Sequence, residues 1–353
     1  MTIKASGGNP PTNSLSFQEI EAEFGAQSPR SLGSYRHTQT VNGLTFNGID
    51  SGVPSSGQIA FSDFYGKSLN IVVDCFSGST ESRINAKNNK WNNNNIVIIN
   101  PSTVSKKEEG TRITIRVNKK FGSDKSDTKH CALRTGVWSN PAQIIVDLGS
   151  NAKILGAGGD GGAGSMGTKT GAKGQPGGDG TSGLGIEHQG TVVNYRSGSL
   201  ISAGFGGGGG GGGGRETSKN DRRAGGGGGG GGAGFPFGNG GIGGTPQEGT
   251  RQANEDVGSP GTNATENTAG TGGAGGDNDD QAFGQKGGDG GDNEQNPAAG
   301  PSDDSPGGAA GANGAAIRVT SGVSFTFGTG PKDDGEIRPS SFTNPSNAAT
   351  DVA

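Results

Sequence analysis

The chain has few of the side chains from which hydrophobic cores are built. Hydrophobic residues make up 27% of its 353 residues and aromatic residues 5%, whereas ordinary globular domains are about 45 to 50% apolar. It has no run of 18 apolar residues, so we expect no insertion into a membrane. The formal net charge of -4 argues against a nucleic-acid-binding surface. Most of the chain is therefore not predicted to form a conventional core.

Cysteines and targeting signals are also scarce. Met1 to Pro11 is polar and rich in turn-forming residues, unlike a secretion signal, so we expect a soluble protein that is not exported by the usual route. Cys75 and Cys131 are the two cysteines. A chain made in a reducing compartment favours two buried thiols over a disulfide, which stays the alternative.

Residue patterns typical of catalysis or metal binding are missing. His37, His130 and His188 lie far apart without metal-ligand spacing, and no carboxylate stands in an apolar segment that would raise its pKa for acid–base work. Gly66-Lys67-Ser68 resembles the end of a phosphate-binding loop, but Phe61 occupies the position of the required glycine. We predict no enzyme activity, no cofactor and no metal.

Glycine is what the chain has in abundance. Of its 76 glycines, 58 lie between Gly156 and Ala316, with unbroken runs at Gly206–Gly214 and Gly225–Gly232. Elsewhere in this stretch glycine recurs at every third position, as from Gly171 to Gly183. This period matches the three residues per turn of a polyproline-type helix, whose glycine edges would let backbone groups of neighbouring helices form hydrogen bonds. The spacing predicts a polyglycine II helix bundle; a flexible glycine linker is the main alternative, and collagen is disfavoured because proline is too rare.

The predicted fold is mainly β plus irregular structure, in four parts. Residues 1–68 are an attachment segment, 69–155 a small antiparallel β-sandwich, 156–330 the glycine-rich polyglycine II domain with displayed loops, and 331–353 a C-terminal tail. The sandwich rests on short β-branched segments bounded by turn residues: Asn70–Asp74, Ile96–Asn100, Thr111–Val117, Gln143–Leu148 and Lys153–Leu155. Ile317–Thr320 and Ser324–Phe327 are expected to form a closing hairpin.

The attachment segment is expected to dock on another protein through apolar side chains. Ser14 or Ser16 can N-cap a short helix with one apolar stripe, and a second segment, Ile59 to Gly66, repeats the pattern. The predicted docking residues are Leu15, Phe17, Ile20, Phe24, Ile59, Phe61, Phe64 and Tyr65. The alternative is that both elements cap the following domain.

Several segments resemble bacteriophage tail fibres and tail-fibre adhesins with a glycine-rich domain. The similarity is carried by Asn151 to Gly162, by Val192 to Phe205 followed by polyglycine, and by the N-terminal phrases Leu15 to Gly25 and Gly57 to Lys67. The resemblance implies a non-enzymatic virion protein of the tail, made in the host cytoplasm and assembled as a homotrimer or seated on another virion component. It further implies docking on other tail or baseplate proteins and loops that bind a polysaccharide or outer-membrane protein of the host.

Receptor contacts are expected in the polar loops of the glycine-rich stretch, namely 215–224, 245–269, 277–283 and 292–306. The predicted contact residues are Arg215, Arg222, Arg223, Phe235, Phe237 and Phe283. Phe235-Pro236-Phe237 is either an apolar tip or a packing wedge. A structural spacer or adaptor of the virion is the alternative function, because these loops have few aromatic residues; an ice-binding protein is a third class.

Overall fold

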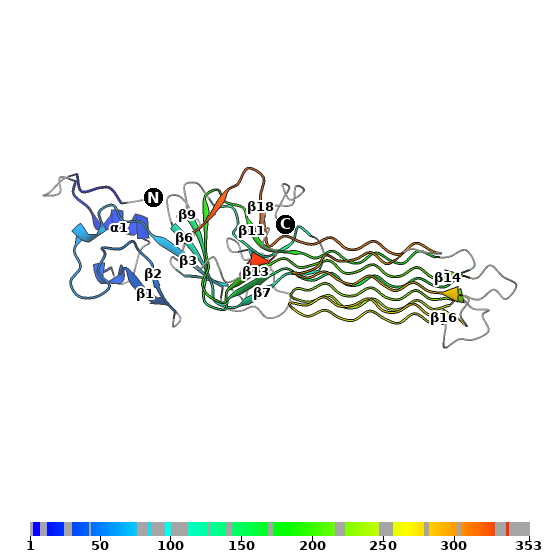
Figure 1. Cartoon of the computed structure of the whole chain (residues 1–353). Helices are drawn as coiled ribbons and strands as arrows, with labels where there is room; N and C mark the ends of the chain where they lie inside the picture. Colours follow the sequence, from blue (N-terminus) through cyan, green and yellow to red (C-terminus); the bar gives the residue numbers. More distant parts are fainter. Residues whose placement is uncertain are drawn as a thin grey trace.

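The protein is an elongated molecule with its N-terminal part at one end and its glycine-rich segments at the other (Figure 1). The computed structural model describes residues 3–7, 13–24, 30–41, 44–75, 84–85, 96–99, 112–125, 128–138, 143–168, 172–215, 223–246, 257–278, 282–301, 305–328 and 337–338. β-Sheets lie between the two ends (Figure 1). The described residues contain a single α-helix.

The N-terminal part combines short helices with one hairpin. Its elements are α1 (Phe17–Phe24), the 3₁₀ helices η1 (Leu32–Ser34) and η2 (Phe61–Phe64), and the antiparallel strands β1 (Thr38–Val41) and β2 (Leu44–Asn47). Ser16 caps α1: its backbone N–H donates to Glu19 Oε2 at 2.8 Å, and Glu19 N–H donates to Ser16 Oγ at 3.2 Å. This reciprocal pair is a capping box and confirms one of the two predicted caps.

The middle of the molecule consists of three sheets with largely parallel strands. One sheet has the order β19 (Phe325–Phe327), β12 (Thr191–Asn194), β9 (Gln143–Leu148), β6 (Arg112–Val117), β3 (Asn70–Cys75), β5 (Ile96–Ile99). The second has the order β18 (Ile317–Val319), β11 (Ser182–Ile186), β8 (Cys131–Arg134), β4 (Ile84–Asn85). The third has the order β20 (Ile337–Arg338), β13 (Leu200–Ser202), β10 (Lys153–Leu155), β7 (Lys120–Gly122).

The chain winds through these sheets as a coil. β6, β7 and β8 enter three different sheets in turn, and β9, β10 and β11 then pair in parallel with them, one strand per sheet. β12, β13 and β18 add the next layer in the same way. Within these three sheets, the β3–β5 pair is the antiparallel one among the described strands.

The predicted antiparallel β-sandwich is therefore wrong. β6 and β9 do alternate between exposed and buried side chains, as the sequence suggested, but alternation shows which face is buried and not the direction of the neighbouring strand. The predicted closing hairpin is also wrong. β18 and β19 lie in different sheets, and each pairs in parallel with an earlier strand, β11 and β12 respectively.

The hydrophobic core lies inside this coil and continues into the N-terminal part. Inward-facing side chains from all three sheets are fully buried, among them Ile113, Ile144, Leu133, Phe121 and Ile201. Cys75 and Cys131 are buried thiols within the same sheets. Strands that precede and follow the glycine-rich stretch share this core.

The glycine-rich stretch enters the coil as two insertions. Residues 156–181 connect β10 to β11, and residues 203–316 connect β13 to β18; we call these two insertions together the glycine block. Its described residues contain no helix, so the predicted C-terminal polyglycine II helix bundle is wrong. Extended segments instead run side by side away from the sheets (Figure 1): 156–167, 172–181, 203–213, 225–233, 238–246, 257–264, 269–276, 284–291, 297–301 and 305–316.

Hydrogen bonds between backbones hold these segments together. In segment 225–233, successive N–H groups donate to three different neighbours: Gly226 to Ser165 O (2.9 Å), Gly227 to Gln285 O (2.8 Å) and Gly228 to Ser259 O (2.9 Å). Its carbonyls accept from three further segments: Gly229 O from Gly241 (2.8 Å), Gly230 O from Gly208 (2.8 Å) and Gly231 O from Gly270 (2.8 Å). Segment 225–233 is thus surrounded by neighbours, and so is segment 203–213.

These two central segments carry the two unbroken glycine runs. A Cβ on Gly229 would lie 2.0 Å from Gly208 O, and one on Gly210 would lie 1.9 Å from Ala163 O. Side chains have no room along these two runs and project from the outer segments, which have solvent on one side. The position of the long runs in the sequence therefore follows from their place at the centre of the block.

Candidate functional site

The far end of the glycine block gathers many of the places where the chain reverses direction. β14 (Gly214–Arg215) pairs antiparallel with β15 (Arg223–Ala224), and β16 (Asp277–Asn278) pairs with β17 (Ala282–Phe283). The two hairpins are joined by a hydrogen bond from Gly276 N to Gly225 O at 2.8 Å. Both lie at the end opposite the N-terminal part (Figure 1), which we call the distal end.

Further described segments end at the same place. Gly167 N donates to Thr245 O at 3.1 Å, so the segments that end at Thr168 and Pro246 lie together there. A Cβ on Gly212 would lie 2.2 Å from Ser305 O, which places the start of segment 305–316 beside β14. The extended segments thus bring two hairpins and the ends of further segments, far apart in the sequence, to one end.

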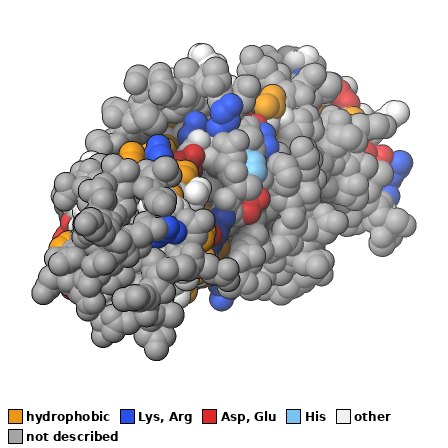
Figure 2. Space-filling model, turned by 90° about the vertical axis from the view of Figure 1, so that its right-hand side faces the viewer, with side chains coloured by type: hydrophobic (Ala, Val, Ile, Leu, Met, Phe, Trp, Pro, Cys, Tyr) orange, Lys and Arg blue, Asp and Glu red, His pale blue; other side chains and the backbone are white. Residues whose placement is uncertain are grey.

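Apolar side chains are exposed next to these connections. Met166 is 48% exposed, Val257 42% and Phe283 48%, and each stands at or within two residues of the end of a described segment. In the view from this end, apolar, basic and acidic side chains of described residues are visible (Figure 2). Exposed large apolar side chains can mark a protein-binding surface.

A protein-family comparison agrees with this arrangement. The model of the family described as phage tail fibre adhesin Gp38 matches residues 80–340, which includes the glycine block and every strand of the three sheets except β3. The chain belongs to this family. No curated protein and no solved structure matches it. The predicted resemblance to phage tail-fibre adhesins is confirmed, and membership implies a virion component with a role in host binding.

The structure of this Gp38-family adhesin divides the predicted receptor contacts between its two ends. Phe283 and Arg223 lie at the distal end, where Arg223 is buried and Phe283 exposed. Arg215 is placed there by its backbone in β14, and Arg222 lies outside the described residues. Phe235 lies at the other end of the block, next to the sheets, where its carbonyl accepts from Ser123 N at 3.2 Å.

Phe235 and Phe237 are thus separated from the distal connections. Lys120 Nζ lies 3.7 Å from the centroid of the Phe235 ring, a cation–π distance, and Phe237 is 43% exposed. This position agrees with the packing-wedge alternative. Met166 and Val257, in contrast, are exposed near the distal connections and were not predicted as contact residues. The sequence feature that could have indicated them is a single large apolar residue on an outer segment, close to a loop.

An ion-pair cluster joins the glycine block of the adhesin to its sheets. Glu266 accepts from Lys153 Nζ at 2.5 Å and from Lys120 Nζ at 3.0 Å, and the two lysines stand on β10 and β7. Burial alone would raise the pKa of Glu266, but the hydrogen bonds from Lys153 and Lys120 outweigh it and hold the pKa below its usual value. The carboxylate therefore stays charged and ties the turn at 264–268 to the third sheet.

The predicted docking residues also fall into two groups. Ile20, Phe24 and Phe64 are buried in the N-terminal core, which agrees with a structural role. The others are partly exposed: Phe61 is 38% exposed, Leu15, Phe17 and Ile59 pack against the core from outside, and Tyr65 OH donates to Asn13 O. We call Leu15, Phe17, Ile59 and Phe61 the N-terminal patch. The rings of Phe17 and Phe61 are arranged edge to face, with their centroids 5.8 Å apart.

The part of the chain that the structure describes holds no group of three or more His, Cys, Asp or Glu side chains placed to bind a metal ion. None of its helices is long and apolar enough to cross a membrane.

Proposed function

We propose that this adhesin binds the host surface through its distal end and docks on the phage tail through its N-terminal part, without catalysing a reaction. The partners would be tail or baseplate proteins at one end and a polysaccharide or outer-membrane protein of the host at the other. A homotrimer, expected from the family resemblance, stays a prediction that sedimentation analysis would test.

The observation that carries the proposal is the convergence of chain reversals on one end of an elongated molecule. The central segments of the glycine block have no room for side chains, so recognition falls to side chains of the outer segments and of the distal end, where Met166, Val257 and Phe283 are exposed. The backbone hydrogen bonds give these connections a rigid support, which lowers the entropy lost on binding.

Two phenylalanines allow a matched test. Phe283 and Phe237 are similarly exposed, 48% and 43%, but stand at opposite ends of the glycine block. We expect Phe283→Ser to weaken binding of the purified protein to host cells by roughly 30-fold, because losing an interface anchor costs about 2 kcal/mol. Phe237→Ser should leave binding unchanged, and both variants should retain the wild-type melting temperature.

Replacing residues 216–222 with a Gly-Ser linker of equal length extends the test to a whole connection. Adhesion should fall while particles still assemble. If both Phe283→Ser and this replacement leave adsorption intact and alter only assembly, the protein acts as a structural spacer or adaptor and the host-binding proposal is wrong.

A further inference from the structure

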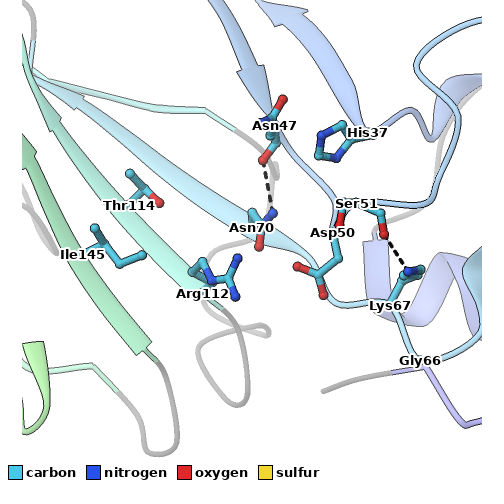
Figure 3. Close-up of a pocket in the computed structure, with 10 residues that line it drawn as sticks. All are labelled: His37, Asn47, Asp50, Ser51, Gly66, Lys67, Asn70, Arg112, Thr114 and Ile145. Atoms are coloured by element: carbon cyan, nitrogen blue, oxygen red, sulfur yellow. Dashed lines mark hydrogen bonds between the residues drawn. The ribbon is translucent and has the colours of Figure 1, made fainter. Parts of the chain in front are cut away.

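A polar groove lies between the N-terminal part and the outer face of the six-stranded sheet. It has a volume of about 610 Å³, which suits one or two sugar rings or a similar small ligand. Asn70, Arg112, Thr114 and Ile145 form its floor, and His37, Asn47, Asp50, Ser51, Gly66 and Lys67 line its walls. Figure 3 shows the two sets of side chains facing each other across the groove.

The strand register brings the floor residues together. Asn70 on β3 stands opposite Arg112 on β6, and Thr114 on β6 stands opposite Ile145 on β9. These side chains point to the face of the sheet that lies away from the hydrophobic core, since the intervening Ile113 and Ile144 are fully buried. The groove is therefore built by the fold and lies outside the core.

Asn70 has an unsatisfied acceptor in this groove. The residue is 7% exposed, and its side-chain N–H donates to Asn47 O at 3.2 Å. Its Oδ1 atom is buried and has no hydrogen-bond partner among the residues that the structure describes. Buried acceptors are normally paired, because an unpaired one is destabilising. A ligand that donates a hydrogen bond would satisfy it.

The remaining walls offer both acceptors and donors. Asp50 receives a hydrogen bond from Ser68 N at 3.0 Å through Oδ2, which leaves Oδ1 able to accept another. On the donor side, Arg112 uses Nε for Gln143 Oε1 at 3.1 Å, so its terminal nitrogens can reach a ligand. Lys67 Nζ donates to Ser51 O at 2.5 Å and has further N–H groups.

We propose that this groove binds a saccharide unit through its hydroxyl groups. A hydroxyl donates and accepts at once, so neighbouring hydroxyls can donate to Asn70 Oδ1 and the Asp50 carboxylate while accepting from Arg112 and Lys67. A simple anion such as acetate or phosphate would meet the cations but has little to donate to Asn70. A peptide backbone is disfavoured because the floor is a sheet face, which presents side chains and not the unpaired backbone groups of a sheet edge.

The test is calorimetric titration of the full chain with five monosaccharides: glucose, galactose, mannose, rhamnose and N-acetylglucosamine. Arg112→Met removes a groove donor, and Arg116→Met makes the same change on the same strand and face but outside the groove. Asp50→Asn removes the wall charge while keeping an oxygen for Ser68 N. All three variants are compared with the wild type by melting temperature, and acetate, phosphate and tetra-alanine are titrated as probes of the competing chemistries.

At least one sugar should bind, with affinity reduced tenfold or more by Arg112→Met and Asp50→Asn but unchanged by Arg116→Met. Three results would overturn the proposal: none of the five sugars binds at millimolar concentration; acetate or phosphate binds as well as any sugar and with the same response to Arg112→Met; or tetra-alanine is the ligand that responds. The experiment is independent of host binding at the distal end, so either proposal can fail alone.

Discussion

A single methyl group at the centre of the glycine block should destabilise the protein strongly. In Gly229→Ala the new Cβ would lie 2.0 Å from Gly208 O, where ordinary contact begins near 3.4 Å. Segment 203–213 or 225–233 must therefore move by about 1.4 Å, the difference of these distances. A displacement of that size takes hydrogen bonds of 2.8 Å beyond bonding range.

The hydrogen bonds at this contact give the expected loss of folding stability. Four bonds of 2.8 Å are made by the two residues: Gly229 N to Gly162 O, Gly241 N to Gly229 O, Gly162 N to Gly208 O, and Gly208 N to Gly230 O. At about 1 kcal/mol each their loss costs about 4 kcal/mol. Replacing glycine with alanine restricts the unfolded chain and returns about 1 kcal/mol. The net loss of about 3 kcal/mol corresponds to a fall in melting temperature of roughly 6 to 12 °C.

Gly178→Ala is the matched control, measured by scanning calorimetry of the full chain alongside Gly229→Ala. Gly178 lies on an outer segment and is exposed, and the atom nearest to its new Cβ is Asp160 N at 3.0 Å. A shift of a few tenths of an ångström relieves that contact, so the melting temperature should stay within about 2 °C of the wild type. If Gly229→Ala melts at or above the temperature of Gly178→Ala, close backbone packing does not hold the block together.

Three other substitutions test the junction of the block with the sheets and the N-terminal part. Glu266→Gln should lower the melting temperature at pH 7. The folded pKa of Glu266 lies below its ordinary value of 4.5, so the carboxylate stabilises the protein above that pH and its contribution is lost on further acidification. The melting temperatures of wild type and variant should therefore converge in scans from pH 6 to 3. A constant difference across that range would contradict the ion-pair assignment. Phe61→Ser in the N-terminal patch should reduce incorporation into particles without changing the melting temperature. Phe24→Ala, at a side chain that is 2% exposed, should instead destabilise the fold by about 3 to 5 kcal/mol. Normal particle incorporation of Phe61→Ser would show that the patch has no docking role.

Local signals in the sequence predicted local structure well. The Ser16 cap of α1 and the strand positions around Arg112–Val117 and Gln143–Leu148 agree with the structure, because capping and alternation depend on neighbouring residues. Strand direction did not follow from them. Parallel pairing in this coil joins β6 to β9 and β12 to β19, and the second of these pairs spans the whole of the longer glycine insertion.

The glycine spacing indicated tight backbone packing but not its form. Close contacts between backbones are present throughout the block, yet they join extended segments and not the helices expected from the period of three. The sequence also gave no sign of which reversals lie at which end. Phe235 and Phe283 stand in similar contexts of glycine and polar residues, but one lies beside the sheets and the other at the distal end.

The two insertions of the glycine block separate the distal connections, whose sequences can vary, from the segments that support them. Both ends of each insertion are fixed in the same three-sheet coil, and within the block every described segment forms backbone–backbone hydrogen bonds with its neighbours. A new distal connection has only to span two neighbouring segments whose positions do not depend on its sequence. Under the proposed function, recombination or point mutation between such segments supplies a phage with new host specificities while the supporting fold is inherited unchanged.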